Sequence, residues 1–357
     1  MKSPYAGLPA RAFWRTGVSE QNPLTITDLY RRKFQIGFEE KIVTAGSCFA
    51  QHIAKNFTKH GYRVVNAEPA PEGMDAEAAK KFGYGVYSAR YGNIYTTRQL
   101  LQLTLESLGA RTPQAIVWEK DGRYYDALRP SVEPEGLGSP EEVMVHRRAH
   151  LTAVRRMLTS MDLFVFTFGL TEAWVDKRDG TVFPTAPGTI AGSFDPELFE
   201  FKNFTFTEVM DDFLRFRQLV LKRNPKARFL VTVSPVPLTA TAADEHVLAA
   251  TTYSKSVLRA VAGELAQRFW DVDYFPSYEI IASPFARGFF YEGNLRTVHP
   301  AGVENVMRIF FEAHGGAPAK VKESTSAPKR PGKSKPVASE EDVVCEEILM
   351  EAFNKHG

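Results

Sequence analysis

The chain has little of what marks secreted, membrane-spanning or nucleic-acid-binding proteins. Only two of its 357 residues are cysteines, Cys48 and Cys345, which excludes a disulfide framework and favours a reducing compartment. Its 44 basic and 42 acidic residues leave a net charge of +2, too small to mark a nucleic-acid or membrane surface. Residues 1–17 lack the apolar core of a signal peptide, and nowhere do about eighteen uncharged apolar residues follow one another. We therefore expect a cytoplasmic protein with no membrane span and no nucleic-acid partner.

Nucleotide-binding motifs are absent as well. The sequence contains neither a P-loop nor a dinucleotide fingerprint, which argues against a nucleotide-dependent enzyme, and no cofactor is expected. Hydrophobic residues make up 44% of the chain, enough for a sizeable core in one large domain or two small ones. A globular enzyme fits these bounds.

The most informative stretch is residues 41–57, KIVTAGSCFAQHIAKNF. An apolar run suited to a buried strand ends at Gly46, and apolar residues then recur at four-residue spacing on one face of a helix, at Phe49, Ile53 and Phe57. A strand, tight turn and helix would place the Ser47 hydroxyl at the carboxyl edge of a sheet, beside a helix N-terminus that favours a developing anion. This is how a nucleophilic serine is set up. Alternatively, Ser47 only caps the helix.

Strands and helices alternate along the rest of the chain, which predicts a parallel sheet covered by helices on both faces. In such α/β sheets ligands bind outside the carboxyl ends of the strands. Further strands are predicted at residues 62–66, 162–168, 228–233 and 271–275, and further helices at 98–108, 141–158, 204–221, 246–269 and 301–311.

Four segments lie outside this pattern. Residues 1–38 are predicted to form an N-terminal arm, packed on the core through Trp14, Tyr30 and Phe34. Residues 111–140 have no clean period and are interpreted as an irregular loop that shapes the substrate opening. Residues 316–339 are too polar to order themselves and predict a disordered linker. Residues 340–357 then predict a short amphipathic helix that docks on a protein partner.

Residues Gly46 to Ala50 spell GSCFA, and this stretch resembles the signature of the GSCFA-domain family, within the SGNH-hydrolase-like superfamily. The resemblance covers most of residues 4–312 and implies a three-layer, flavodoxin-like sheet of about five strands. Residues 39–315 are then the catalytic domain. Ser47 matches the catalytic serine of the superfamily's first block.

A nucleophilic serine needs a base, usually a histidine. Of the eight histidines, two follow Ser47 in its own helix and two lie in or near the tail. His146 and His150 are four apart on one helical face, but without a third ligand they indicate a solvated face rather than a metal site. His246 and His299 remain. Resemblance to the superfamily's last block favours His299, with His246 as the alternative base.

The chain departs from the superfamily pattern at two positions. Arg296 stands where the superfamily normally has an aspartate three residues before the histidine. Three alternatives follow: Ser47 and His299 act as a dyad, Glu172 or Glu292 supplies the carboxylate, or the chain has lost hydrolytic activity. Thr171 stands where the third block has its oxyanion-binding asparagine. The remaining oxyanion donors implied by the resemblance are the N–H groups of Ser47 and Gly92, with Asn93 as a substitute amide.

The leading hypothesis is a serine esterase or O-acyltransferase that forms an acyl-Ser47 intermediate on an acylated small molecule or carbohydrate, as in polysaccharide biosynthesis. Arg296 would suit an anionic substrate or the phosphates of an acyl-CoA donor. The alternative is a non-catalytic module that binds a glycan or another ligand on a degenerate hydrolase fold.

Overall fold

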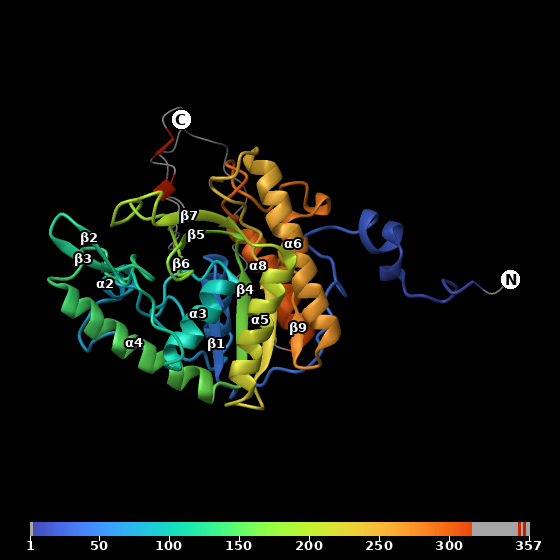
Figure 1. The fold of residues 1–357 in the computed structure, drawn as a ribbon. Helices are drawn as coiled ribbons and strands as arrows, with labels where there is room; N and C mark the ends of the chain where they lie inside the picture. The colour runs from blue at the N-terminus through green and yellow to red at the C-terminus, as the bar shows by residue number, and fades with distance from the viewer. Residues whose placement is uncertain (1–2, 316–348, 351–352, 355–357) are drawn as a thin grey trace, which may run out of the picture.

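A four-stranded parallel sheet forms the centre of the molecule (Figure 1), which is described by a computed structural model over residues 3–315, 349–350 and 353–354. Within these residues no helix is both long and apolar enough to cross a membrane. The strands, in their order across the sheet, are β1 (Ile42–Gly46), β4 (Leu163–Phe168), β8 (Arg228–Val233) and β9 (Val272–Tyr274). Their registers pair Gly46 with Thr167 and Thr167 with Thr232, so the carboxyl ends of β1, β4 and β8 share one edge.

The fifth strand, predicted at residues 62–66, is reduced to a single bridge. Val64 pairs in parallel with Ile42, whose N–H donates to Arg63 O (3.0 Å) and whose carbonyl accepts from Val65 N (2.8 Å). The chain then turns toward the proline-bearing segment 68–71, so no further ladder forms. With this bridge beside β1, the order across the sheet is that of flavodoxin-like folds, and it reverses between β1 and β4.

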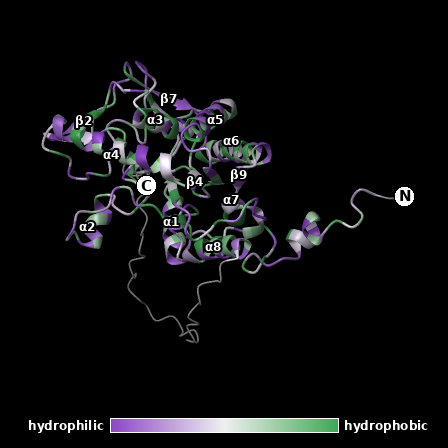
Figure 2. Cartoon of the chain, turned by 90° about the horizontal axis from the view of Figure 1, so that it is seen from below, coloured by the Kyte–Doolittle hydropathy of each residue, from purple (hydrophilic) through white to green (hydrophobic). Residues whose placement is uncertain are grey.

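Helices cover both faces of the sheet (Figure 2). One layer contains α3 (Thr97–Ser107), α4 (Pro140–Ser160), α5 (Phe206–Leu221) and α6 (Val247–Arg268). The other contains α1 (Phe49–Lys59), α7 (Ser277–Ala282) and α8 (Pro300–His314). The predicted α/β class is thus confirmed.

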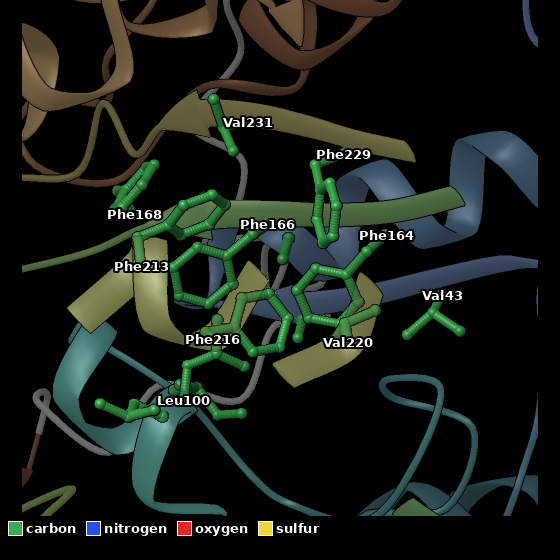
Figure 3. Packing of buried hydrophobic residues seen from close by; sticks show 14 of the residues in the cluster. Val43, Leu100, Phe164, Phe166, Phe168, Phe213, Phe216, Val220, Phe229 and Val231 are labelled. Atoms are coloured by element: carbon green, nitrogen blue, oxygen red, sulfur yellow. The ribbon is translucent and has the colours of Figure 1, made fainter. Parts of the chain in front are cut away.

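Alternate side chains of the strands feed two separate cores. Phe164, Phe166 and Phe168 of β4 pack with Phe213 and Phe216 of α5 (Figure 3). The intervening residues of β4, together with Phe49, Ile53 and Phe57 of α1, face the α1–α8 layer, as the four-residue spacing predicts. A strand that is buried on both faces is apolar at nearly every position, which explains why Thr167 is the one polar residue of β4.

Residues 111–140 are more regular than expected. They contain an antiparallel hairpin of β2 (Val117–Lys120) and β3 (Arg123–Asp126), whose Trp118 and Tyr125 pack in a small third core. A second small sheet follows β4 directly: β5 (Glu172–Asp176), flanked by β6 (Val182–Phe183) and β7 (Phe199–Asn203). Figure 1 shows this sheet above the end of β4. The rim of the domain therefore contains short antiparallel strands as well as irregular loops.

The N-terminal arm is anchored by only part of the predicted set. Tyr30 is buried between Phe275 and Phe310, and Phe34 packs against the same core. Trp14, by contrast, is 72% exposed, so its prediction as an anchor is wrong. It follows the short helix η1 (Ala10–Ala12), in a segment that reaches away from the domain in Figure 1. The predicted linker 316–339, and most of the predicted helix 340–357, lie outside the described residues.

Candidate functional site

The turn after β1 is held in a conformation that only glycine adopts easily. Gly46 has φ +136°, and a Cβ there would lie 2.4 Å from the carbonyl oxygen of Thr167 on β4. This close approach lets Ser47 follow the strand directly, at the point where the strand order reverses. Ligands of flavodoxin-like sheets bind at such a reversal.

The Ser47 hydroxyl has no hydrogen-bond partner although the side chain is buried, with 3% of its surface exposed. It does not cap α1, because the helix begins at Phe49 and its N-cap residue is Cys48. The interpretation of Ser47 as a helix cap is therefore wrong. Native proteins rarely leave a buried hydroxyl unpaired, since the lost bond to water costs free energy. The hydroxyls of Thr44 and Thr167, within β1 and β4, are also buried and unbonded, but Ser47 lies past the end of its strand, at the edge of the sheet where ligands bind.

The segment that contains Gly92 and Asn93 runs beside this turn. Ile94 N donates to Gly46 O (2.9 Å), which fixes the segment next to β1, and Gly92 has φ +68°. The Tyr87 hydroxyl connects the two segments, since it lies 3.2 Å from the Ser47 carbonyl oxygen and bonds to Asn93 Oδ1.

The segment after β4 closes the other side of the turn. A Cβ on Gly169 would lie 3.0 Å from Ser47 Cβ, so the backbone of Gly169 lies close to the serine side chain and a larger residue would displace the serine. Two residues on, the Thr171 hydroxyl is buried and makes no hydrogen bond. Glu172 Oε1 accepts a bond from the Thr241 hydroxyl (2.9 Å). The structure thus brings Ser47, Asn93, Thr171 and Glu172 to one edge of the sheet.

One predicted oxyanion donor is already used. Ser47 N donates to Thr167 O (3.2 Å), continuing the β1–β4 ladder past the end of the strand. A donor engaged in the sheet cannot also bind an oxyanion without breaking that bond, so the prediction for the Ser47 N–H is wrong. A register that extends one residue beyond a strand is invisible in the sequence.

Lys255 is a residue of this site that the sequence interpretation missed. It lies on α6 with 1% of its surface exposed, and its Nζ donates to Gly169 O (2.7 Å), on the glycine that touches Ser47. The neighbouring Ser254 Oγ accepts a bond from Thr171 N (3.0 Å). The available signal was a lysine on the apolar stripe of a helix, at the same face as Leu258.

His299 is not bonded to Ser47. It is the N-cap of α8, where its Nδ1 accepts from Ala301 N (3.1 Å), and its half-exposed ring places Nε2 3.9 Å from Glu292 Oε1. A backbone N–H can only donate, so Nδ1 must be unprotonated and the neutral ring carries its proton on Nε2. Arg296 lies in the preceding loop, where its backbone N–H donates to Asn294 Oδ1 (3.0 Å). Tyr291 ties this loop to Pro235, just beyond β8 (2.6 Å).

His246, the alternative base, has the same arrangement as His299. It is the N-cap of α6, and its Nδ1 accepts from Leu248 N (3.1 Å). Both candidate bases are thus helix-capping histidines.

The prediction that His146 and His150 form a solvated face is wrong for one of the pair. His146 is exposed, but His150 has 1% of its side chain exposed, and its Nδ1 lies 2.7 Å from Glu68 Oε2. Burial, together with the nearby charge of Arg129, lowers the pKa of His150 to about 4. The ring is therefore neutral near pH 7 and donates to Glu68, a pairing across 82 residues that no local pattern announces.

Fold and site together define a three-layer α/β protein with a polar strand-to-helix turn at the switch point of its sheet. The chain belongs to the GSCFA family, whose model matches residues 41–310, from β1 to within α8. A search of curated proteins finds no match to the sequence.

Proposed function

We propose that the protein is a serine-dependent esterase or O-acyltransferase in which Ser47 carries the acyl group. The observation that carries this proposal is the buried Ser47 hydroxyl, which neither caps α1 nor bonds to another group. A nucleophile that is already positioned, but not committed to a hydrogen bond, is suited to attack a bound carbonyl. We also propose that the chain is related to SGNH-like hydrolases. A cytoplasmic location is proposed as well, because the scarcity of cysteine favours a reducing compartment.

The reaction would proceed in two steps. Ser47 Oγ attacks the ester carbonyl, its proton passes to a base, and the alcohol leaves with a proton, so that an acyl-Ser47 ester remains. Water or an acceptor hydroxyl, for example of a carbohydrate, then takes the acyl group and regenerates the serine. Gly92 N–H and the Asn93 side chain are the proposed oxyanion donors, and Lys255 positions the Gly169 carbonyl behind the serine.

His299 is the proposed base, and its capping bond sets a condition on that role. To accept the serine proton at Nε2, the ring must carry its other proton on Nδ1, which is incompatible with accepting from Ala301 N. The ring must therefore leave the cap when substrate binds. Glu292, whose Oε1 is 3.9 Å from Nε2, is the nearest carboxylate partner seen for the ring. Arg296, in the same loop, is the proposed contact for an anionic substrate or an acyl-CoA donor.

The test replaces the imidazole and keeps the cap. Asparagine is a preferred N-cap residue, so His299→Asn removes the base without removing the acceptor for Ala301 N. We expect it to lower kcat for p-nitrophenyl acetate by more than about a hundredfold. His246→Asn is the matched control, because it makes the same exchange at the cap of α6 and should leave kcat unchanged. If both variants keep wild-type kcat, His299 is only a cap.

A non-catalytic, ligand-binding module is the second candidate. The observation that favours it is that both candidate bases are engaged as helix caps and neither is hydrogen-bonded to the Ser47 hydroxyl. In that case ligand binding would persist in a Ser47→Ala variant while no ester is turned over by the wild type.

A further inference from the structure

An apolar groove lies beside the Ser47 turn and is not used by the chemistry above. Its volume is about 480 Å³, within the range of small-molecule binding sites. Its apolar wall consists mainly of Leu170, Trp174, Phe183, Phe194, Phe201 and Leu238.

The groove adjoins the site through the segment that follows β4. Leu170 lines it and is the residue after Gly169, whose backbone touches Ser47. Glu172, one residue beyond Thr171, lines it as well. The lining thus begins one residue beyond the glycine that packs against Ser47, which puts the groove next to the proposed position of the reacting carbonyl.

Aromatic rings of the small sheet form its wall. Trp174 of β5 packs edge-on against Phe194, with ring centroids 5.0 Å apart, and against Phe201 of β7 at 5.9 Å. Trp174 is only partly buried and Phe194 is 46% exposed, so these rings keep apolar surface open to a ligand. Covering such surface is favourable in proportion to its area.

The polar groups in the groove are few, and they select against two kinds of ligand. The side-chain hydrogen-bonding groups among the lining residues are threonine hydroxyls, the indole N–H of Trp174 and one carboxylate, that of Glu172, whereas a sugar ring presents a hydroxyl on most of its carbons. The carboxylate also repels a free carboxylic acid. A neutral, apolar chain fits this lining better than either.

We propose that this groove binds the apolar acyl chain of the ester that Ser47 attacks, so that the substrate class is a medium-chain acyl ester. This inference rests on the proposed function. Met350 and Phe353, from the C-terminal part of the chain, also line the groove and contribute to its apolar wall.

The test is a binding measurement that needs no catalysis. Bromooctanol is neutral, cannot be hydrolysed, and quenches a tryptophan that its bromine touches. Added to the full-length wild type, it should give saturable quenching, whereas bromoethanol at equal concentration should give only the weak collisional quenching of the exposed Trp14 and Trp270. Along the series of intermediate bromoalkanols, each methylene should tighten binding about fourfold until the groove is filled.

Three variants make the assignment specific. Trp174→Phe keeps an aromatic wall but should abolish the saturable quenching, because it removes the reporter. Ala240→Phe narrows the groove at an exposed position and should weaken binding about tenfold or more. Ala249→Phe, an equal change at an exposed position of α6 away from the groove, should bind as the wild type does. Saturable quenching that survives Trp174→Phe would overturn the proposal.

Ester kinetics separate this inference from the proposed function. We expect p-nitrophenyl octanoate to have a higher kcat/KM than the acetate in the wild type, and to lose that advantage in Ala240→Phe. Saturable quenching without turnover of either ester supports the groove and refutes acyl transfer at Ser47. Equal kcat/KM for both esters without saturable quenching refutes the groove and leaves Ser47 chemistry standing.

Discussion

Two polar regions of the domain differ in how their buried groups are bonded. Between α4 and the β3 hairpin, the buried charges are bonded to one another: Arg147 reaches both Asp126 (3.1 Å) and Glu106, and Arg129 also bonds to Asp126 (2.7 Å). At the carboxyl edge, the hydroxyls of Ser47 and Thr171 are as deeply buried but unbonded.

The difference distinguishes buried polar groups that stabilise the fold from buried polar groups that remain available for a reaction. A buried charge must be paired because its desolvation is costly. Pairing also shifts the pKa of the buried group. Burial alone would raise the pKa of Asp126, but the charges of Arg147 and Arg129 lower it to about 2. A hydroxyl left unpaired in the same domain lowers stability slightly and keeps a reactive group available. The comparison therefore predicts that mutations in the two regions act on different properties.

The largest effect on stability is expected in the charge network. Arg147→Met leaves Glu106 without this cation and Asp126 with one instead of two, so the free energy of unfolding should fall by about 3–5 kcal/mol. Urea denaturation measures it. Arg148→Met, at the exposed neighbouring position of α4, should change it by less than about 0.5 kcal/mol. A loss below about 1 kcal/mol for Arg147→Met would mean that the network is not structural.

The next effect concerns pH. The pKa of His150 is about 4 in the folded protein and about 6.5 when unfolded, so the unfolded chain binds the extra proton first as pH falls. The contribution of His150 is present above pH 6.5 and should fall by about 2–3 kcal/mol between pH 7.5 and 4.5.

The variant His150→Gln keeps a donor for Glu68 and does not titrate, so it should lack this share of the pH dependence. Urea denaturation at the two pH values gives the difference. His146→Gln, on the exposed face of the same helix, should follow the wild type. His314, whose burial also lowers its pKa to about 4, contributes equally in all three proteins. An unchanged pH dependence in His150→Gln would contradict the assignment.

The smallest effect is expected at the site itself. Ser47→Ala removes a buried hydroxyl that bonds to nothing, so the free energy of unfolding should stay the same or rise by up to about 1 kcal/mol. Thr205→Ala is the contrasting variant, because Thr205 belongs to a complete capping box at the start of α5 and its loss should cost about 1 kcal/mol. If Ser47→Ala destabilises as much as Thr205→Ala does, the two regions do not differ in the way described.

The sequence predicted the elements whose burial is continuous and missed those that depend on distant partners. The strands at 163–168 and 228–233 are apolar at most positions, because both of their faces are covered. β5 and β7 are partly buried and mixed in composition, so they lack such a run. The same limit applies to the site. Ser47 follows from its local strand-to-helix pattern, whereas the contact between Lys255 and Gly169 joins segments 86 residues apart.

The consecutive residues His299 and Pro300 show which part of the site could have been predicted from the sequence. His299 precedes Pro300 at the first position of α8, a context that favours an N-cap, so the capping bond could have been inferred from the sequence. Whether His299 acts as a base depends instead on where the loop places its imidazole ring. Local chemistry thus identified a helix start, and only the tertiary structure shows that the ring is not bonded to Ser47.

The central claim is that Ser47 is a nucleophile, and covalent labelling tests it most directly. The full-length protein is incubated with a fluorophosphonate, and the adduct is located by intact-mass and peptide mass spectrometry. We predict one adduct per chain, on Ser47, which is absent from Ser47→Ala, slower to form in His299→Asn and unchanged in His246→Asn. A wild-type protein that stays unlabelled, or an adduct on another residue that persists in Ser47→Ala, would contradict the account.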